Sequence, residues 1–251
     1  MRPFLGDPWY MAIPTIKDSY DIGTQLCDDP LVTVIDDFLA VDDRNSIMAL
    51  AAGNLHQAKV TLDSGNDYSD KRTGSVTWLK HDNALVVRNL VTRVSDLVGI
   101  SSRYAESLQV IHYATEQEYK PHFDGWDINT DKGQEKLKKD GQRLVTALIY
   151  LNEVDAGGDT IFPKLNLQVE AKPGRLVLFH DTIYGQIQRH PHSLHGGMPV
   201  QHGEKWACNL WFRSVPQRSI GGGKPVGSSR GNAAARNKAK NAKAARKKRR
   251  R

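Results

Sequence analysis

The chain has 251 residues, of which 39% are hydrophobic, enough for one large domain or a domain with appendages. No apolar stretch approaches the roughly 20 residues of a membrane-spanning helix, and residues 1–14 lack the apolar run of a secretory signal. Cys27 and Cys208 lie far apart and show no metal-knuckle spacing. This argues against a disulfide scaffold and for a reducing compartment, cytoplasmic or nuclear, although two thiols still permit one bridge.

The net charge of +7 combines two parts of opposite sign. Residues 216–251 hold thirteen of the 35 Lys and Arg and no Asp or Glu, which leaves 22 basic and 28 acidic residues in 1–215. The body therefore has a net charge of −6 and the end of the chain is strongly basic. We expect an N-terminal extension at 1–30, a globular domain at 31–215 and a flexible basic tail at 216–251.

The first elements predicted are a strand over residues 31–39 and a helix that starts at about residue 42. Acidic side chains at Asp42 and Asp43 favour the positive N-terminal end of a helix dipole. Ile47, Leu50 and Ala51 would form its apolar face.

A second helix is predicted from about residue 84 to residue 98, because its apolar residues repeat at i, i+3 and i+4. Asp82 or Asn83 could cap its start, and Gly99 could end it. Both helices are expected to cover one side of a sheet.

Strand-like runs dominate from residue 108 onward, and Gly and Pro residues separate them. Many short strands without alternating helices argue against a parallel α/β sheet. They favour an α+β, mainly β fold, namely an antiparallel double-stranded β-helix or jelly roll buttressed by the two N-terminal helices. The polar segment 127–142 is predicted to be a mobile insertion beside the site. The strands are expected at 108–113, 144–151, 175–180 and 205–213.

A metal site is indicated by His122 and Asp124, two residues apart after an apolar run. On an extended chain, side chains at i and i+2 project to the same face, so one segment can offer two ligands to one ion. His195 is the preferred third ligand, because Gly196 allows a close backbone approach beside it and Lys205 follows downstream. Two imidazoles and one carboxylate on one face of an ion suit a non-haem Fe(II) oxygenase.

Other interpretations of these residues remain open at this point. An H-x-D triplet also arises by chance on surface loops, and His180, His190 and His192 are further candidate ligands. His180 could instead lie within reach of the ligands without binding the ion. Lys205 could anchor the distal carboxylate of a keto acid, or it could be a surface lysine paired with Glu204.

With these residues assembled, the chain resembles the prolyl 4-hydroxylase family of Fe(II)- and 2-oxoglutarate-dependent dioxygenases, from about residue 32 to residue 213. Several ordered motifs at compatible separations carry the resemblance, and together they are more specific than any single one. They are RTGS at 72–75, LQVIHY at 108–113, HFD at 122–124, RLVTALIYLN at 143–152, GGDTIFP at 157–163, SLHGGMPV at 193–200 and GEKW at 203–206.

The resemblance implies three Fe(II) ligands, two cosubstrate-binding residues and two residues near the bound peptide. They are, in that order, His122, Asp124 and His195; Lys205 and Tyr113; and Arg143 and Trp211. It also implies an enzyme like procollagen-proline 4-dioxygenase, which uses Fe(II), 2-oxoglutarate, O2 and L-ascorbate. Such an enzyme couples oxidative decarboxylation of 2-oxoglutarate to C–H hydroxylation of proline in a peptide or protein.

Two rival functions stay open beside the proline hydroxylase. One is the same chemistry on nucleic acid, and the other is a non-catalytic jelly-roll binding or structural protein. Ten of the last sixteen residues, 236–251, are cationic, so the tail could bind nucleic acid or another polyanion. No membrane partner is expected, and the sequence does not predict the oligomeric state.

Overall fold

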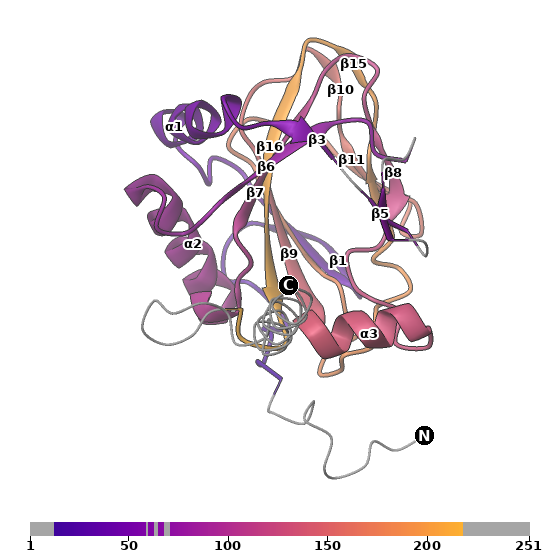
Figure 1. Cartoon of the computed structure of the whole chain (residues 1–251). Coiled ribbons are helices and arrows are strands. Elements are labelled where there is room, and N and C mark those ends of the chain that lie inside the picture. The colour runs from indigo at the N-terminus through magenta and orange to yellow at the C-terminus, as the bar shows by residue number, and fades with distance from the viewer. Residues whose placement is uncertain (1–12, 59, 63–64, 68–70, 218–251) are drawn as a thin grey trace, which may run out of the picture. The chain divides into compact units, whose positions relative to one another are not determined.

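The computed structural model describes residues 13–58, 60–62, 65–67 and 71–217. Most of its strands belong to two antiparallel sheets, one of eight strands and one of four. Phe162 of the smaller sheet packs edge-on against Phe179 of the larger one, with ring centroids 5.1 Å apart, so the two sheets share a core. The mainly β jelly roll predicted from the sequence is confirmed (Figure 1).

The strands follow a spatial order that differs from their order in the chain. The larger sheet runs β1 (Thr24–Asp28), β2 (Leu31–Ile35), β13 (Leu176–His180), β9 (Arg143–Tyr150), β16 (Lys205–Arg213), β7 (Leu108–Tyr113), β6 (Ser75–Leu79) and β3 (His56–Gln57). The smaller sheet runs β12 (Leu167–Val169), β11 (Thr160–Phe162), β14 (His195–Gly197) and β8 (Tyr119–His122). Two short ribbons pair β10 (Ala156–Gly157) with β15 (Val200–His202), and β4 (Val60–Leu62) with β5 (Gly65–Asp67).

Two helices cover one face of the larger sheet, as expected (Figure 1). They are α1 (Val41–Ala52) and α2 (Leu85–Val98). The spacing of Val87, Leu90 and Val94 places all three on the buried side of α2. Gly99 ends α2 with φ of 73°, a left-handed conformation that favours glycine. A short 3₁₀ helix, η2 (Ser102–Tyr104), follows.

The predicted caps of α2 were wrong at its N-terminus. Ala84 occupies the cap position, and no side chain bonds the free N–H groups there. Asp82 and Asn83 instead lie in the turn before the helix. The apolar face buried against the sheet therefore stabilises α2 without a side-chain cap.

The segment 127–142, predicted to be a mobile insertion, contains the helix α3 (Asp131–Asp140), which was not predicted from the sequence. Thr130 caps it, because its hydroxyl accepts a hydrogen bond from the Gly133 N–H at 3.0 Å. The helix is polar on nearly all sides, and Gly133 is its one buried residue. The sequence therefore lacked the apolar repeat from which a helix is predicted.

Part of the expected N-terminal extension belongs to the larger sheet. Residues 24–28 form its edge strand β1, and Ile16, only 5% exposed, packs into the core between sheet and helices. Nucleic-acid binding through 236–251 concerns residues that lie outside the described part of the chain. None of the helices described has the length and apolar character needed to cross a membrane.

Candidate functional site

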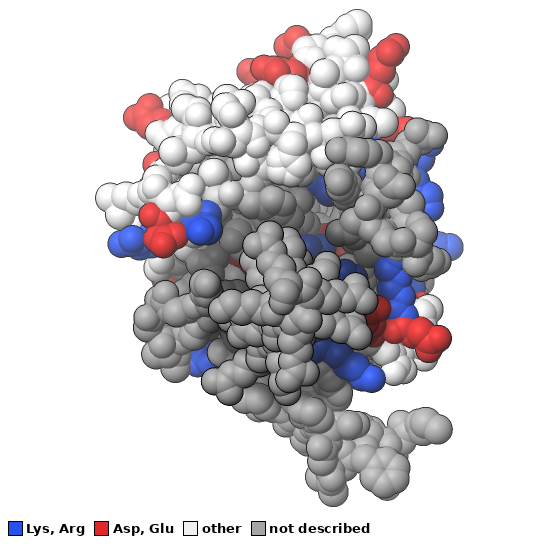
Figure 2. All heavy atoms as spheres, in the orientation of Figure 1, with Lys and Arg blue, Asp and Glu red and all other residues white. Residues whose placement is uncertain are grey.

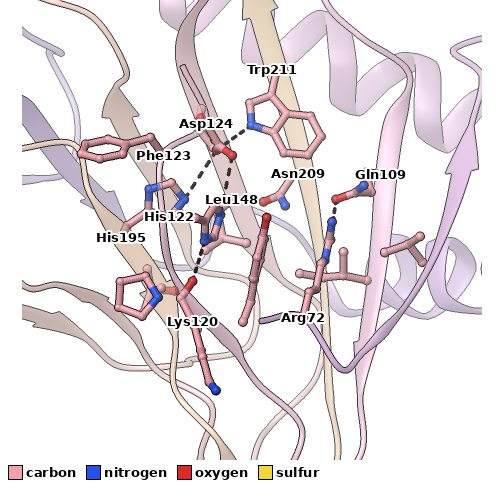
Figure 3. A pocket seen from close by; sticks show the side chains of 18 of the residues that line it. Arg72, Gln109, Lys120, His122, Phe123, Asp124, Leu148, His195, Asn209 and Trp211 are labelled. Atoms are coloured by element: carbon pink, nitrogen blue, oxygen red, sulfur yellow. Dashed lines mark hydrogen bonds and ion pairs between the residues drawn. The ribbon is translucent and has the colours of Figure 1, made fainter. Parts of the chain in front are cut away.

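The three predicted metal ligands come together at one point between the two sheets. His122 at the end of β8 and His195 at the start of β14 are direct partners across the antiparallel pair. Asp124 follows β8 by two residues, and its carboxylate lies 3.7 Å from His122 Nε2 and 3.5 Å from His195 Nε2. One ligand atom from each residue lies within 4.8 Å of the other two (Figure 3).

Backbone carbonyls fix both imidazoles in the tautomer that binds a metal through Nε2. His122 Nδ1 donates to the Lys120 carbonyl at 2.9 Å, and His195 Nδ1 donates to the Ser193 carbonyl at 2.9 Å. The Nε2 lone pairs are therefore free and directed toward Asp124. Burial, and then the neighbouring His195, lower the pKa of His122 to about 3, so its ring is neutral.

The close approach of β8 and β14 depends on Gly196, as the sequence suggested. A Cβ atom at this position would lie 3.0 Å from Pro121 N and 3.0 Å from the Tyr119 carbonyl oxygen. A larger residue would push the two strands apart and separate the imidazoles.

The Asp124 carboxylate is also bound from the side of the larger sheet. Trp211 Nε1 donates to Oδ2 at 2.7 Å, and Arg143 Nη1 lies 3.4 Å from Oδ1. Burial by itself would raise the pKa of Asp124, but its neighbours His195 and Arg143 hold it below its ordinary value. Arg143 and Trp211, predicted near the peptide, thus contact the predicted metal ligand Asp124 while also lining the cavity.

Glu106, which the sequence did not single out, holds Arg143 in place. Arg143 Nε and Arg213 Nε both donate to Glu106 Oε1 at 2.7 Å. Burial opposes the charge on this carboxylate, yet the two guanidinium groups keep the pKa of Glu106 below its ordinary value. The Arg143 guanidinium stacks 3.7 Å from the Trp211 ring centroid, so one cluster fixes both residues.

The predicted cosubstrate residues lie in the same cavity. Lys205 on β16 and Tyr113 on β7 are direct partners across the larger sheet. Lys205 is 3% exposed, its Nζ donates to the Gly158 carbonyl, and burial lowers its pKa to about 8. Glu204 pairs instead with His112 at 2.7 Å, which rules out the surface pair Lys205–Glu204. Among the described residues, no carboxylate forms an ion pair with Lys205.

One cavity of about 810 Å³ connects the metal ligands to Lys205. All seven site residues predicted from the sequence line it. Its described lining contains five basic side chains and one acidic one, which are Lys71, Arg72, Lys120, Arg143 and Lys205 against Asp124. On the face in Figure 2, several Lys and Arg side chains are visible, and most of the visible Asp and Glu side chains lie toward the edge. Such a cavity favours an anionic ligand.

The ligand atoms fit Fe(II). Two imidazole nitrogens and one carboxylate oxygen form a facial set, and the cavity leaves space for further ligands on the other side. His180, by contrast, bonds the Tyr20 hydroxyl at 3.3 Å, and His190 bonds Asp29 at 3.1 Å. Among the described residues, His122, Asp124 and His195 make the one cluster with metal-binding geometry.

Comparison with known proteins identifies the family of this chain. Residues 108–213, which contain the three ligands and Lys205, match the model of the 2OG-Fe(II) oxygenase superfamily. A protein of Acanthamoeba polyphaga mimivirus assigned to the prolyl 4-hydroxylases is 33% identical over 200 residues, which cover 79% of this chain and 80% of that one. The chain belongs to the prolyl 4-hydroxylase family.

Further relatives support membership in the prolyl 4-hydroxylase family. Prolyl 4-hydroxylase 5 of Arabidopsis thaliana is 32% identical over 206 residues, covering 73% of this chain and 68% of that protein. The viral collagen prolyl hydroxylase of Paramecium Bursaria Chlorella virus-1, solved as its 2OG complex, superposes with a TM-score of 0.61 and 25% identity. The match covers 76% of this chain and 99% of the solved one. As a family member, the chain is a 2-oxoglutarate-dependent dioxygenase.

Proposed function

We propose that this enzyme hydroxylates a proline residue in a peptide or protein, with His122, Asp124 and His195 as the Fe(II) ligands. The observation that carries the proposal is the meeting of these three side chains in one cavity with Lys205, a buried lysine that forms no ion pair with a carboxylate among the described residues. The reaction consumes 2-oxoglutarate, O2 and peptidyl proline and yields succinate, CO2 and hydroxyproline. When bound, Fe(II) supplies the redox chemistry that activates O2.

Lys205 is proposed to bind the distal carboxylate of 2-oxoglutarate. A buried ammonium group whose hydrogen-bond partner is a neutral carbonyl gains a charge-assisted hydrogen bond when a carboxylate arrives. Tyr113, 4% exposed and opposite Lys205 across the strand pair, would form the wall beside the same carboxylate. These two residues orient the cosubstrate so that its keto-acid end faces the metal ligands.

Trp211 and Arg143 are proposed to lie beside the bound proline. Trp78, which is 41% exposed, lines the same cavity and lies 5.9 Å from Trp211 between ring centroids. Aromatic surfaces suit the rigid apolar ring of proline and peptides in the polyproline II conformation. L-Ascorbate is proposed as the reductant that restores oxidised iron, without assignment of a binding residue.

The rival functions have less support. The catalytic residues expected of a dioxygenase are all present, which argues against a non-catalytic jelly-roll protein. The relatives are prolyl 4-hydroxylases, which favours a peptide substrate over nucleic acid. A role for residues 236–251 in binding a polyanion stays a prediction.

The test measures succinate formation from 2-oxoglutarate with proline-rich peptides and, separately, with oligonucleotides. We expect turnover with the peptides, mass spectrometry showing one added oxygen on proline, and none in His122→Ala or Asp124→Ala. His112→Ala is the matched control, because this histidine lies on β7 outside the cavity lining. Wild-type turnover in both ligand variants would contradict the proposed site, and turnover with oligonucleotides alone would favour the nucleic-acid alternative.

A further inference from the structure

Asp181, directly after β13, is a buried carboxyl group that the proposed reaction does not use. It is 0% exposed, and its backbone is fixed, because its N–H donates to the Leu144 carbonyl and its carbonyl accepts from the His190 N–H, both at 2.9 Å. Its Oδ1 has no hydrogen-bond partner in the part of the chain that the structure describes. Burying a carboxyl group with so few hydrogen-bond partners costs folding free energy, so its presence calls for a role toward a neighbouring residue.

Among the described residues, the one side chain that bonds the Asp181 carboxyl group is that of Thr146 on β9, which is 1% exposed. Thr146 Oγ1 lies 2.8 Å from Asp181 Oδ2 and 2.9 Å from Asp124 Oδ2. A single hydroxyl group therefore stands between the predicted metal ligand and a second carboxyl group. Both distances are those of good O–H···O hydrogen bonds.

The number of hydrogen atoms available to the two hydrogen bonds of Thr146 determines which group donates in each bond. The Thr146 hydroxyl has one hydrogen and can donate it to one carboxylate only, so a second hydrogen is needed to make both bonds. Asp124 already accepts hydrogen bonds from Trp211 Nε1 at Oδ2, 2.7 Å away, and from Arg143 Nη1 at Oδ1, 3.4 Å away, so both of its oxygens act as acceptors. Burial, and then the charge of Asp124, raise the pKa of Asp181 well above its ordinary value.

The second hydrogen therefore belongs to Asp181. The neutral carboxylic acid of Asp181 donates through Oδ2 to Thr146 Oγ1, and the Thr146 hydroxyl donates to Asp124 Oδ2. Together with Trp211 Nε1, the Thr146 hydroxyl gives Asp124 Oδ2 two hydrogen-bond donors. These two donors fix the orientation of the carboxylate. Removing a group that hydrogen-bonds to a metal ligand and fixes its orientation commonly weakens metal affinity by about 10- to 100-fold.

We infer that Asp181 is a positioning residue that orients the metal-binding carboxylate of Asp124 through Thr146, acting as a neutral hydrogen-bond donor. The inference rests on the proposed function, in which Asp124 binds Fe(II). His180, which the sequence allowed within reach of the ligands, bonds Tyr20, and it is the neighbouring Asp181 that bonds Thr146.

The experiment compares two pairs of variants of similar shape. Asp181→Asn keeps a neutral donor and Asp181→Leu removes it, while Thr146→Ser keeps the hydroxyl and Thr146→Val removes it. The dissociation constant of Co(II) is measured by visible absorption titration of the full chain without 2-oxoglutarate. Thermal unfolding of each metal-free variant shows whether the fold is intact, and succinate formation gives kcat and KM for 2-oxoglutarate.

We expect Asp181→Leu and Thr146→Val to bind Co(II) about 10- to 100-fold more weakly than the wild type, and Asp181→Asn and Thr146→Ser to bind within about threefold of it. The activity loss should fall on kcat, because Lys205 and the rest of the cosubstrate site are unchanged. Should Asp181→Leu fail to fold, the Thr146 pair decides the question alone.

Two results would overturn the inference. Wild-type Co(II) affinity in Thr146→Val would show that the bridge does not orient Asp124. Equal weakening in Asp181→Asn and Asp181→Leu would show that the charge of Asp181, and not a donated hydrogen, is what matters. His122→Ala distinguishes failure of this inference from failure of the proposed function. If His122→Ala also leaves Co(II) binding unchanged, the proposed metal site itself is wrong. If His122→Ala loses Co(II) binding, the proposed function stands.

Discussion

The four-stranded and eight-stranded sheets differ in strand length and in what they contribute to the cavity. The smaller sheet has strands of three or four residues, and two of them carry the imidazoles of His122 and His195. The larger sheet includes β9 with eight residues and β16 with nine, and it supplies Lys205 and the side chains that hold Asp124. Its other face packs against α1 and α2 in the larger core cluster.

The smaller sheet therefore contributes mainly to the metal site, whereas the larger sheet also determines the stability of the fold. Short strands fix few residues and bury little apolar surface, so their ligands can be changed with little loss of folding free energy. The long strands serve both needs, because one face lines the cavity and the other carries the core. Substitutions in the two sheets should therefore have different readouts.

The largest effect is expected for His195→Ala on β14. Loss of one of three protein ligands should lower succinate formation to background, about a thousandfold or more, since O2 activation needs the bound metal. The unfolding midpoint of the metal-free protein should change by only a few degrees, measured by circular dichroism. A variant that keeps a tenth of wild-type activity would contradict the ligand role of His195.

Leu178→Ala on β13 should lower the stability of the protein and leave its activity nearly unchanged. Leu178 is 0% exposed in the core that faces the helices, so the cavity left by the substitution should cost about 2–5 kcal/mol of unfolding free energy. Urea denaturation measures it, and kcat of the folded variant should stay near wild type. Ile161→Ala, half-buried on β11 of the smaller sheet, is the control and should cost about 1 kcal/mol. Equal costs would remove the distinction between the sheets.

Lys205→Met should raise the KM for 2-oxoglutarate about 100-fold, because the distal carboxylate loses a charge-assisted hydrogen bond. Methionine keeps the length and apolar stem of the side chain, so the fold should tolerate it. Steady-state succinate assays over a range of 2-oxoglutarate concentrations measure this change. An unchanged KM would show that the cosubstrate is anchored elsewhere.

The affinity of the wild type for 2-oxoglutarate should fall as pH rises above about 8. Burial lowers the pKa of Lys205 to about 8, so the free enzyme loses the ammonium above that pH, and only the protonated form attracts the carboxylate. The dissociation constant should then rise by up to about tenfold per pH unit. Lys205→Arg stays charged and should show weaker but nearly pH-independent binding; parallel profiles for the two proteins would contradict this cause.

The smallest effect is expected at the exposed end of the larger sheet, for Asp36→Asn. Asp36 bonds Arg175 at 2.6 Å and Lys172 at 3.2 Å, and these bonds lower its pKa to about 2. The side chain is 42% exposed, so the loss should be less than about 1 kcal/mol at pH 7. Because the folded pKa is the lower one, the difference from wild type should shrink as pH falls from about 4 to about 2 in denaturation experiments.

Patterns that lie within one segment were predicted well. The bounds of β7 and β16 agree with the apolar runs from which they were expected, and the buried face of α2 follows its period of 3.6 residues. Helix α3 was missed, because a helix that packs through one glycine has no apolar repeat to detect. Its signal was a local one, Thr130 before a run of helix-forming residues ended by Gly141.

The sequence by itself determined the ligand types, because imidazole, carboxylate and ammonium chemistry belongs to the residues, and the spacing of His122 and Asp124 shows within one short segment. Only the tertiary structure decided which polar side chains support them. Thr146 and Asp181 come from β9 and the end of β13, and Glu106 reaches Arg213 across 107 positions of the chain. Such partners are brought together by strand register, and register depends on the packing of the whole sheet, which no short stretch of sequence encodes.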